Sequence, residues 1–166
     1  GDTSVHEYPT SEQLAEIAIS ASRVVRLFGF DPKVAFVSHS TFGQPVTSRT
    51  KHIRSAVEIL KEKKVDFKFD GDMQPDVALS EEYNELYPFS EIVGNANILI
   101  MPGQHSAAIS YKMMKTMSGA KVIGPLLIGL GQPIEIAPLR SSTSEILNLA
   151  SVAAYSAGVI NYSKKN

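Results

Sequence analysis

A histidine stands between an apolar stretch and a small polar one in NILIMPGQHSAAISYK, residues 97–112. The apolar part predicts a strand, and the small residues after it predict a helix. Pro102 and Gly103 then lie at the strand exit and His105 at the helix start, where unpaired N–H groups and the helix dipole favour an anion. A bound phosphate is one interpretation. The other is that Ser106 caps the helix while Gly103 permits the turn.

A second candidate for anion binding is PLRSSTSEI, residues 138–146, which precedes and begins another expected helix. Arg140 and three consecutive hydroxyl residues stand just before that helix, and the fork of a guanidinium suits a phosphate or a carboxylate. Ser142 and Glu145 have the spacing of a capping box. Capping alone explains Glu145 and leaves Arg140 unexplained.

The sequence gives little support for a metal-binding site. Asp70, Asp72 and Asp76 gather in FDGDMQPD, but the calcium-loop pattern and its closing glutamate are missing, so we predict a turn with Asx-type hydrogen bonds. The histidines show no metal-ligand spacing, and the chain has no cysteine to complete a zinc site; they stand at positions 6, 39, 52 and 105. We expect no metal in this chain.

Length and composition favour one domain that works in a reducing compartment. The chain has 166 residues and no cysteine, so we expect a cytoplasmic protein. Its 16 basic and 17 acidic residues argue against nucleic acid or anionic membranes as partners. No apolar run approaches the roughly 20 residues that span a bilayer, and the N-terminus lacks a secretory pattern, so we expect a soluble protein. The start at Gly1 without a methionine suggests a piece excised from a longer chain.

Strand-like and helix-like segments alternate along the chain. Helices are expected at 11–28, 75–88, 106–117 and 143–158, with another whose apolar stripe runs from Ile53 to Leu60, and extended apolar segments at 33–38, 65–72, 97–102, 121–130 and 133–139. Basic residues of the second helix fall mostly off its apolar stripe and are expected to face solvent: Lys51, Arg54, Lys61 and Lys63. This alternation predicts a layered α/β domain with a mostly parallel sheet flanked by helices, whose sites lie at the carboxyl ends of strands.

Several segments together resemble the C-terminal half of phosphate acetyltransferases, in order and over nearly the whole chain: SHSTFG, FDGDMQPD, NANILIMP…ISYK, VIGPLLIGLGQPI and SEILNLA. STFGQP, LYPF and MPGQHSAAIS resemble still more closely the transferase-like domain of bacterial NADP-dependent malic enzymes. The resemblance implies an α/β/α fold of the isocitrate/isopropylmalate dehydrogenase type, dimers formed through the domain, and coenzyme A in a cleft between two lobes. In malic enzymes it implies a regulatory domain that senses acetyl-coenzyme A (acetyl-CoA).

The chain departs from active transferases where the family carries its chemistry. The resemblance places a Ser-Arg-Gly stretch before the last helix and an aspartate at that helix's start. Aligning Glu145 with the aspartate puts Pro138, Leu139 and Arg140 at the serine, arginine and glycine. MPGQHSAAIS likewise departs from the family's aspartate-leucine and glycine-asparagine pairs. Proline and leucine neither take a thiol proton nor neutralise a phosphate, so we expect no catalytic residues.

The leading hypothesis is therefore a non-catalytic, acetyl-CoA-sensing regulatory and dimerisation domain of a malic enzyme. NADP and a divalent metal are expected in another domain of that parent enzyme, which oxidatively decarboxylates malate to pyruvate. One alternative is a divergent phosphate acetyltransferase that uses Arg140 and Glu145 after a one-residue shift. The other is a purely structural oligomerisation domain.

Binding of acetyl-CoA asks for apolar walls, a few hydrogen bonds and one or two cations for the phosphates. Lys112, Arg49 and Arg140 are the candidate cations, and the loop of residues 40–43 supplies polar groups. The full set of expected ligand-binding residues is Ser40, Thr41, Gly43, Arg49, Pro102, His105, Lys112, Arg140, Ser141 and Glu145.

Overall fold

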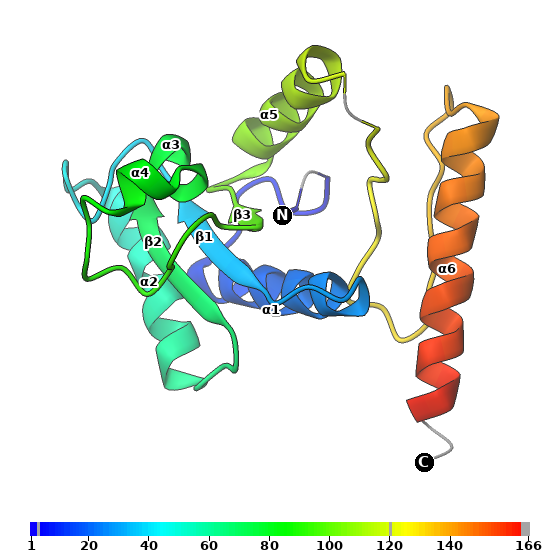
Figure 1. Ribbon diagram of the computed structural model, residues 1–166, viewed down its shortest axis with the longest axis horizontal. Helices are drawn as coiled ribbons and strands as arrows, with labels where there is room; N and C mark the ends of the chain where they lie inside the picture. Colours follow the sequence, from blue (N-terminus) through cyan, green and yellow to red (C-terminus); the bar gives the residue numbers. More distant parts are fainter. Residues whose placement is uncertain (3, 120, 164–166) are drawn as a thin grey trace. The chain divides into compact units, whose positions relative to one another are not determined.

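The computed structural model describes residues 1–2, 4–119 and 121–163. The chain divides into two compact units, Gly1–Met113 and Met114–Asn166, each of which is described by itself. The first unit holds a parallel sheet of three strands in the order β2-β1-β3 (Figure 1). Its strands are β1 (Lys33–Val37), β2 (Lys68–Met73) and β3 (Ile98–Ile100). The helices of the chain are α1 (Ser11–Leu27), α2 (Ser48–Glu62), α3 (Pro75–Leu79), α4 (Glu81–Asn84), α5 (Gln104–Met117) and α6 (Thr143–Ser163).

Helix α1 begins at the capping box expected at Thr10. The Thr10 hydroxyl accepts from the Gln13 amide at 3.2 Å, and the Gln13 side chain accepts from the Thr10 amide at 2.8 Å. These bonds satisfy backbone donors that a helix start otherwise leaves unpaired. His52 of α2 ties the two helices together, because its Nε2 lies 2.8 Å from the Pro9 carbonyl oxygen and its Nδ1 lies 3.1 Å from the Ser11 hydroxyl.

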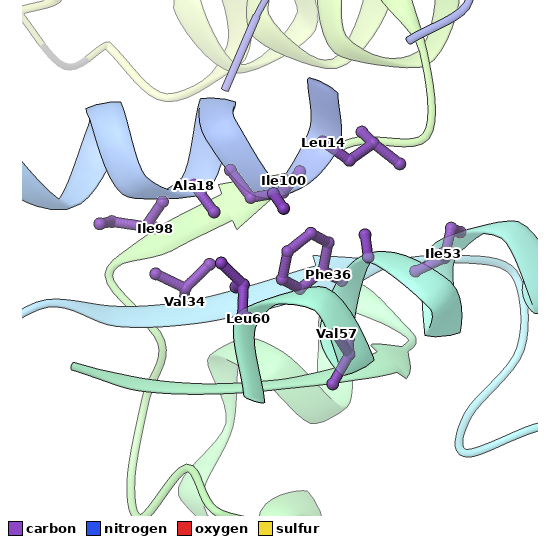
Figure 2. Packing of buried hydrophobic residues seen from close by; sticks show 11 residues of the cluster. Leu14, Ala18, Val34, Phe36, Ile53, Val57, Leu60, Ile98 and Ile100 are labelled. Carbon is purple, nitrogen blue, oxygen red and sulfur yellow. The ribbon is translucent and has the colours of Figure 1, made fainter. Parts of the chain in front are cut away.

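One face of the sheet packs against α1 and α2. Val34 and Phe36 of β1 point to this face, where Leu14 of α1 and Ile53 and Leu60 of α2 surround them (Figure 2). All five side chains are at most 2% exposed. The apolar stripes of both helices, read from their 3.6-residue period, therefore form one core with the strand.

The other face of β1 packs against α3 and the loop after α4. Ala35 faces this side and belongs to a second buried cluster with Met73, Val77 and Ile92. Successive side chains of a strand point to opposite faces, so Val34, Ala35 and Phe36 alternate between the two clusters. Burial on both faces explains why β1 is apolar at every position from Val34 to Val37.

Most expected elements are present, with two changes in the first unit. The strand expected at 65–72 runs instead over Lys68–Met73, and the helix expected at 75–88 is divided into α3 and α4. Ser80 stands between these helices with extended φ and ψ of −122° and 123°, and its hydroxyl accepts from the Tyr83 amide. A serine that caps a new helix start ends the preceding one.

In the second unit, α6 follows a long extended segment. The apolar stretches expected as strands at 121–130 and 133–139 form no strand in the described part of the chain. Five of their large apolar side chains are exposed: Ile123, Leu130, Ile134, Ile136 and Leu139. A strand needs a hydrogen-bonded neighbour, and none of the described strands pairs with these residues. None of the described helices is long and apolar enough to cross a bilayer.

Candidate functional site

The loop after β1 is bound to the end of β2. The Ser38 amide donates to the Met73 carbonyl at 2.9 Å, and the Phe42 amide donates to the Asp72 carbonyl at 2.6 Å. The Gln74 amide in turn donates to the Thr41 hydroxyl at 3.2 Å. Residues 38–44 therefore lie at the carboxyl edge of the sheet, where sites of parallel α/β domains usually form.

Asp72 is the most unusual residue at this edge. Its side chain is fully buried, and neither carboxylate oxygen has a hydrogen-bond partner among the described residues. Arg54 of α2 approaches it, with Nε 3.6 Å from Oδ1. This pair is an ion pair beyond ordinary hydrogen-bond distance. Asp70 instead accepts from the Gly71 and Glu91 amides.

The expected aspartate turn is therefore wrong. Asp70 and Asp72 belong to β2, and Asp76 belongs to α3. The sequence suggested a turn because three aspartates and a glycine fall within seven residues. Pairing with β1, which sets Ala35 against Asp70 and Phe36 against Gly71, makes the segment a strand. Arg54 is exposed, as expected of the solvated face, and its Nε also lies 3.6 Å from Oδ1 of the buried Asp72.

The same loop carries an aromatic cluster. Phe42 has a positive φ of 49°, and its ring centroid lies 5.3 Å from that of Tyr87 and 4.8 Å from that of Phe89. Tilted and edge-on contacts at these distances are favourable. The contacts join the STFG and LYPF segments, which lie more than forty positions apart in the sequence.

The β3–α5 junction is built differently from the expected cap. The Ser106 hydroxyl donates to the Gly103 carbonyl at 2.9 Å, so it does not cap the helix. Gly103 lies where a Cβ would come within 3.1 Å of the Glu7 carbonyl oxygen, and the Gln104 amide donates to that same oxygen at 3.2 Å. The glycine thus allows a close approach of the N-terminal segment. His105 is exposed at the helix start.

The sheet brings half of the expected binding residues to one edge. Because the three strands are parallel, the residues that follow β1 and β3 lie at the same edge; these are Ser40, Thr41, Gly43, Pro102 and His105. Ser40, Thr41 and Gly43 are buried. Arg49, in the first turn of α2, and Lys112, on α5, are exposed. Arg140, Ser141 and Glu145 belong to the second unit, so their relation to this edge stays a prediction.

In the second unit, Glu145 has defined partners. Its carboxylate accepts from the Ser142 amide at 2.8 Å, and its own amide donates to the Ser142 hydroxyl at 3.3 Å. The expected capping box is therefore confirmed. The Lys115 ammonium lies 2.7 Å from Oε1. That ion pair, with the Ser142 donors, lowers the pKa of Glu145 from 4.5 to about 2. Arg140 is exposed beside this box.

Replacing Lys115 with methionine is expected to raise the pKa of Glu145 from about 2 toward its ordinary 4.5. A lowered carboxyl pKa contributes stability that is present above pH 4.5 and is lost as the pH falls toward about 2. Carboxyl NMR titration of the glutamate measures the shift directly. Lys121→Met, an exposed lysine of the same unit, is the control and should leave the titration unchanged. A wild-type pKa near 4.5 would contradict the assignment.

Two site residues escaped the sequence analysis in different ways. Arg54 was correctly placed on a solvated helix face, but its pairing with Asp72 was not predicted, and Asp72 was placed in a turn. No sequence signal pairs them, because α2 and β2 bring together residues 18 positions apart whose spacing fits no single helix or strand. The Phe42 cluster had a weak signal, since STFG and LYPF both entered the resemblance.

Comparisons with known proteins agree with the fold. The family model described as phosphate acetyl/butaryl transferase matches residues 1–154. The chain therefore belongs to the phosphate acetyl/butaryl transferase family. A phosphotransacetylase from Streptococcus pyogenes has the same fold, with a TM-score of 0.89 and 33% identity over 95% of this chain and 48% of that one. The α/β/α fold expected from the resemblance is confirmed.

Two kinds of relative match nearly the whole chain. An NADP-dependent malic enzyme of Rhizobium meliloti (strain 1021) is 48% identical over 157 residues, which are 95% of this chain and 21% of that protein. A phosphate acetyltransferase of Clostridium acetobutylicum is 35% identical over 94% of this chain and 47% of that protein. The chain thus spans about a fifth of the malic enzyme and about half of the transferase.

Proposed function

We propose that the chain is the transferase-like domain of an NADP-dependent malic enzyme, and that it binds acetyl-CoA without transferring its acetyl group. The similarity to malic enzymes, at 48% identity, supports the first part. Membership of the phosphate acetyl/butaryl transferase family supports a ligand of the coenzyme A class. Oxidative decarboxylation of malate, with NADP and a divalent metal, belongs in this proposal to another domain of the parent enzyme.

The proposed loss of acyl transfer rests on Pro138 and Leu139. In the alignment implied by the resemblance, they stand where active transferases have serine and arginine. The Leu139 side chain is fully exposed, and neither residue type takes a proton or holds a positive charge. Glu145, at the aspartate position, is engaged by Lys115 and Ser142. Recognition of the ester needs apolar walls, a few hydrogen bonds, which the loop of residues 40–43 can provide, and a cation for its phosphates.

Regulation follows if acetyl-CoA binds one conformation of the malic enzyme better than another. A ligand shifts such an equilibrium only by its differential affinity for the two states. In this proposal the domain also forms the dimer contact, which transmits the shift between protomers.

Acetyl-CoA is expected to bind the full-length malic enzyme, to change its rate of malate oxidation, and to yield no acetyl phosphate when inorganic phosphate is added. Titration calorimetry, NADPH absorbance and an acetyl phosphate assay measure the three properties. Acetyl phosphate formation that Arg140→Ala abolishes would instead support a divergent transferase. If acetyl-CoA gives no heat of binding and no change in the rate of malate oxidation, the result would support a purely structural oligomerisation domain.

A further inference from the structure

The buried Asp72 carboxylate requires a cation beside it. Its side chain is 0% exposed, and its two oxygens accept no hydrogen bond from the described residues. A carboxylate in such surroundings is tolerated when a positive charge lies close. Among the described residues Arg54 provides that charge, at 3.6 Å from Nε to Oδ1. Asp72 therefore fixes the direction in which the Arg54 side chain extends.

The rest of the Arg54 guanidinium lies over the loop that follows β1. A Cβ at Gly43 would stand 2.6 Å from Nη1 and 3.1 Å from Cζ, so the group rests against the glycine where a side chain would otherwise be. The Arg54 side chain is still 48% exposed. With Nε toward Asp72, the Nη edge faces the loop and solvent. A guanidinium has five N–H donors arranged as a fork.

A second buried polar group belongs to the same loop. The Ser40 residue is 0% exposed, and its hydroxyl oxygen has no hydrogen-bond partner among the described residues. Native proteins pair the great majority of their buried polar side-chain atoms. This hydroxyl is an unused donor in the same loop as Gly43, the glycine that Arg54 covers. An anionic oxygen accepts from both kinds of donor.

We infer that Arg54 binds a phosphate group at the loop of residues 40–43, with Asp72 as the residue that positions its guanidinium. The identification of that phosphate as one of acetyl-CoA rests on the proposed function. The phosphate-binding property itself rests on the three residues and the glycine alone. The same chemistry serves a free phosphate, so pyrophosphate and acetyl-CoA are both needed as probes.

The inference is tested by calorimetric titration of the full-length protein with pyrophosphate and, separately, with acetyl-CoA. Arg54→Gln is expected to weaken binding of both probes by about 10- to 100-fold, the usual effect of losing hydrogen bonds to a charged group. Arg23→Gln is the matched control, because Arg23 is an exposed arginine of α1, and it should bind as the wild type does. Circular dichroism confirms that each variant is folded.

A second pair of variants keeps the Arg54 charge. One variant displaces the guanidinium, and the other is its control. Gly43→Ala is expected to displace the guanidinium and to weaken binding of pyrophosphate by about tenfold, since the new Cβ overlaps Nη1. Gly29→Ala is its control. Gly29 has a φ of +84°, against +85° for Gly43, but nothing lies within 4 Å of its Cβ position. The two alanines thus carry similar backbone strain and differ in the contact with Arg54. If Arg54→Gln does not fold, this pair decides the inference.

The outcomes separate this inference from the proposed function. Acetyl-CoA binding that neither Arg54→Gln nor Gly43→Ala weakens overturns the inference and leaves the proposed function intact. Pyrophosphate binding that these variants weaken, without any binding of acetyl-CoA, supports the inference and overturns the proposed function. Failure of the wild type to bind either probe overturns both.

Discussion

Replacing Gly71 with alanine is expected to lower the free energy of unfolding of the chain by about 2–6 kcal/mol, the sum of a backbone and a packing cost. The φ of Gly71 is +147°, which L side chains rarely adopt, and its new Cβ would lie 2.7 Å from the Phe36 carbonyl oxygen and 2.8 Å from the Phe36 Cβ. These atoms belong to the central strand of the sheet, so they cannot move without disturbing its hydrogen bonds. Urea unfolding followed by amide NMR signals of β1 measures the change.

Gly29→Ala is the control for this prediction as well. Its positive φ of +84° costs about 1–2 kcal/mol for a side chain, and the space around it is open. The difference between the two variants therefore reports the clash with β1. Equal losses in both would show that β2 does not lie against Phe36 as described.

Replacing Phe36 with alanine is expected to lower the free energy of unfolding by about 3–5 kcal/mol, the usual cost of removing a buried aromatic ring. Phe36 is 0% exposed and lies between Leu14 of α1 and Ile53 of α2 in the larger core cluster (Figure 2). Removal of the ring leaves a cavity, which the packed helices around it fill only in part. The same NMR-detected urea titration serves here.

Phe30→Ala provides the comparison, because Phe30 is 65% exposed and its removal should change stability by less than about 1 kcal/mol. A loss from Phe36→Ala as small as that from Phe30→Ala would mean that α1 and α2 do not close over β1.

The sequence by itself determined the elements whose causes are local. Thr10 and Gln13 predicted the start of α1, and Ser142 with Glu145 predicted that of α6; both caps are present. The continuous apolar run of β1 and the stripe of α2 also formed as expected. Capping bonds and helical periodicity join residues within four positions of one another, so the residue types suffice to predict them.

Only the tertiary structure decided which polar residues meet. The sequence allowed both a strand over 65–72 and a turn in FDGDMQPD, and pairing with β1 decides for a strand in which Asp72 is buried. Arg54, which lies beside that carboxylate, belongs to the basic, solvent-facing side of α2. Nothing in the sequence of that side distinguishes Arg54 from its basic neighbours. Conversely, residues 121–139 have the apolar pattern of strands, yet no described strand pairs with them. Burial, ion pairing and strand formation depend on partners distant in the sequence, which neither spacing nor composition specifies.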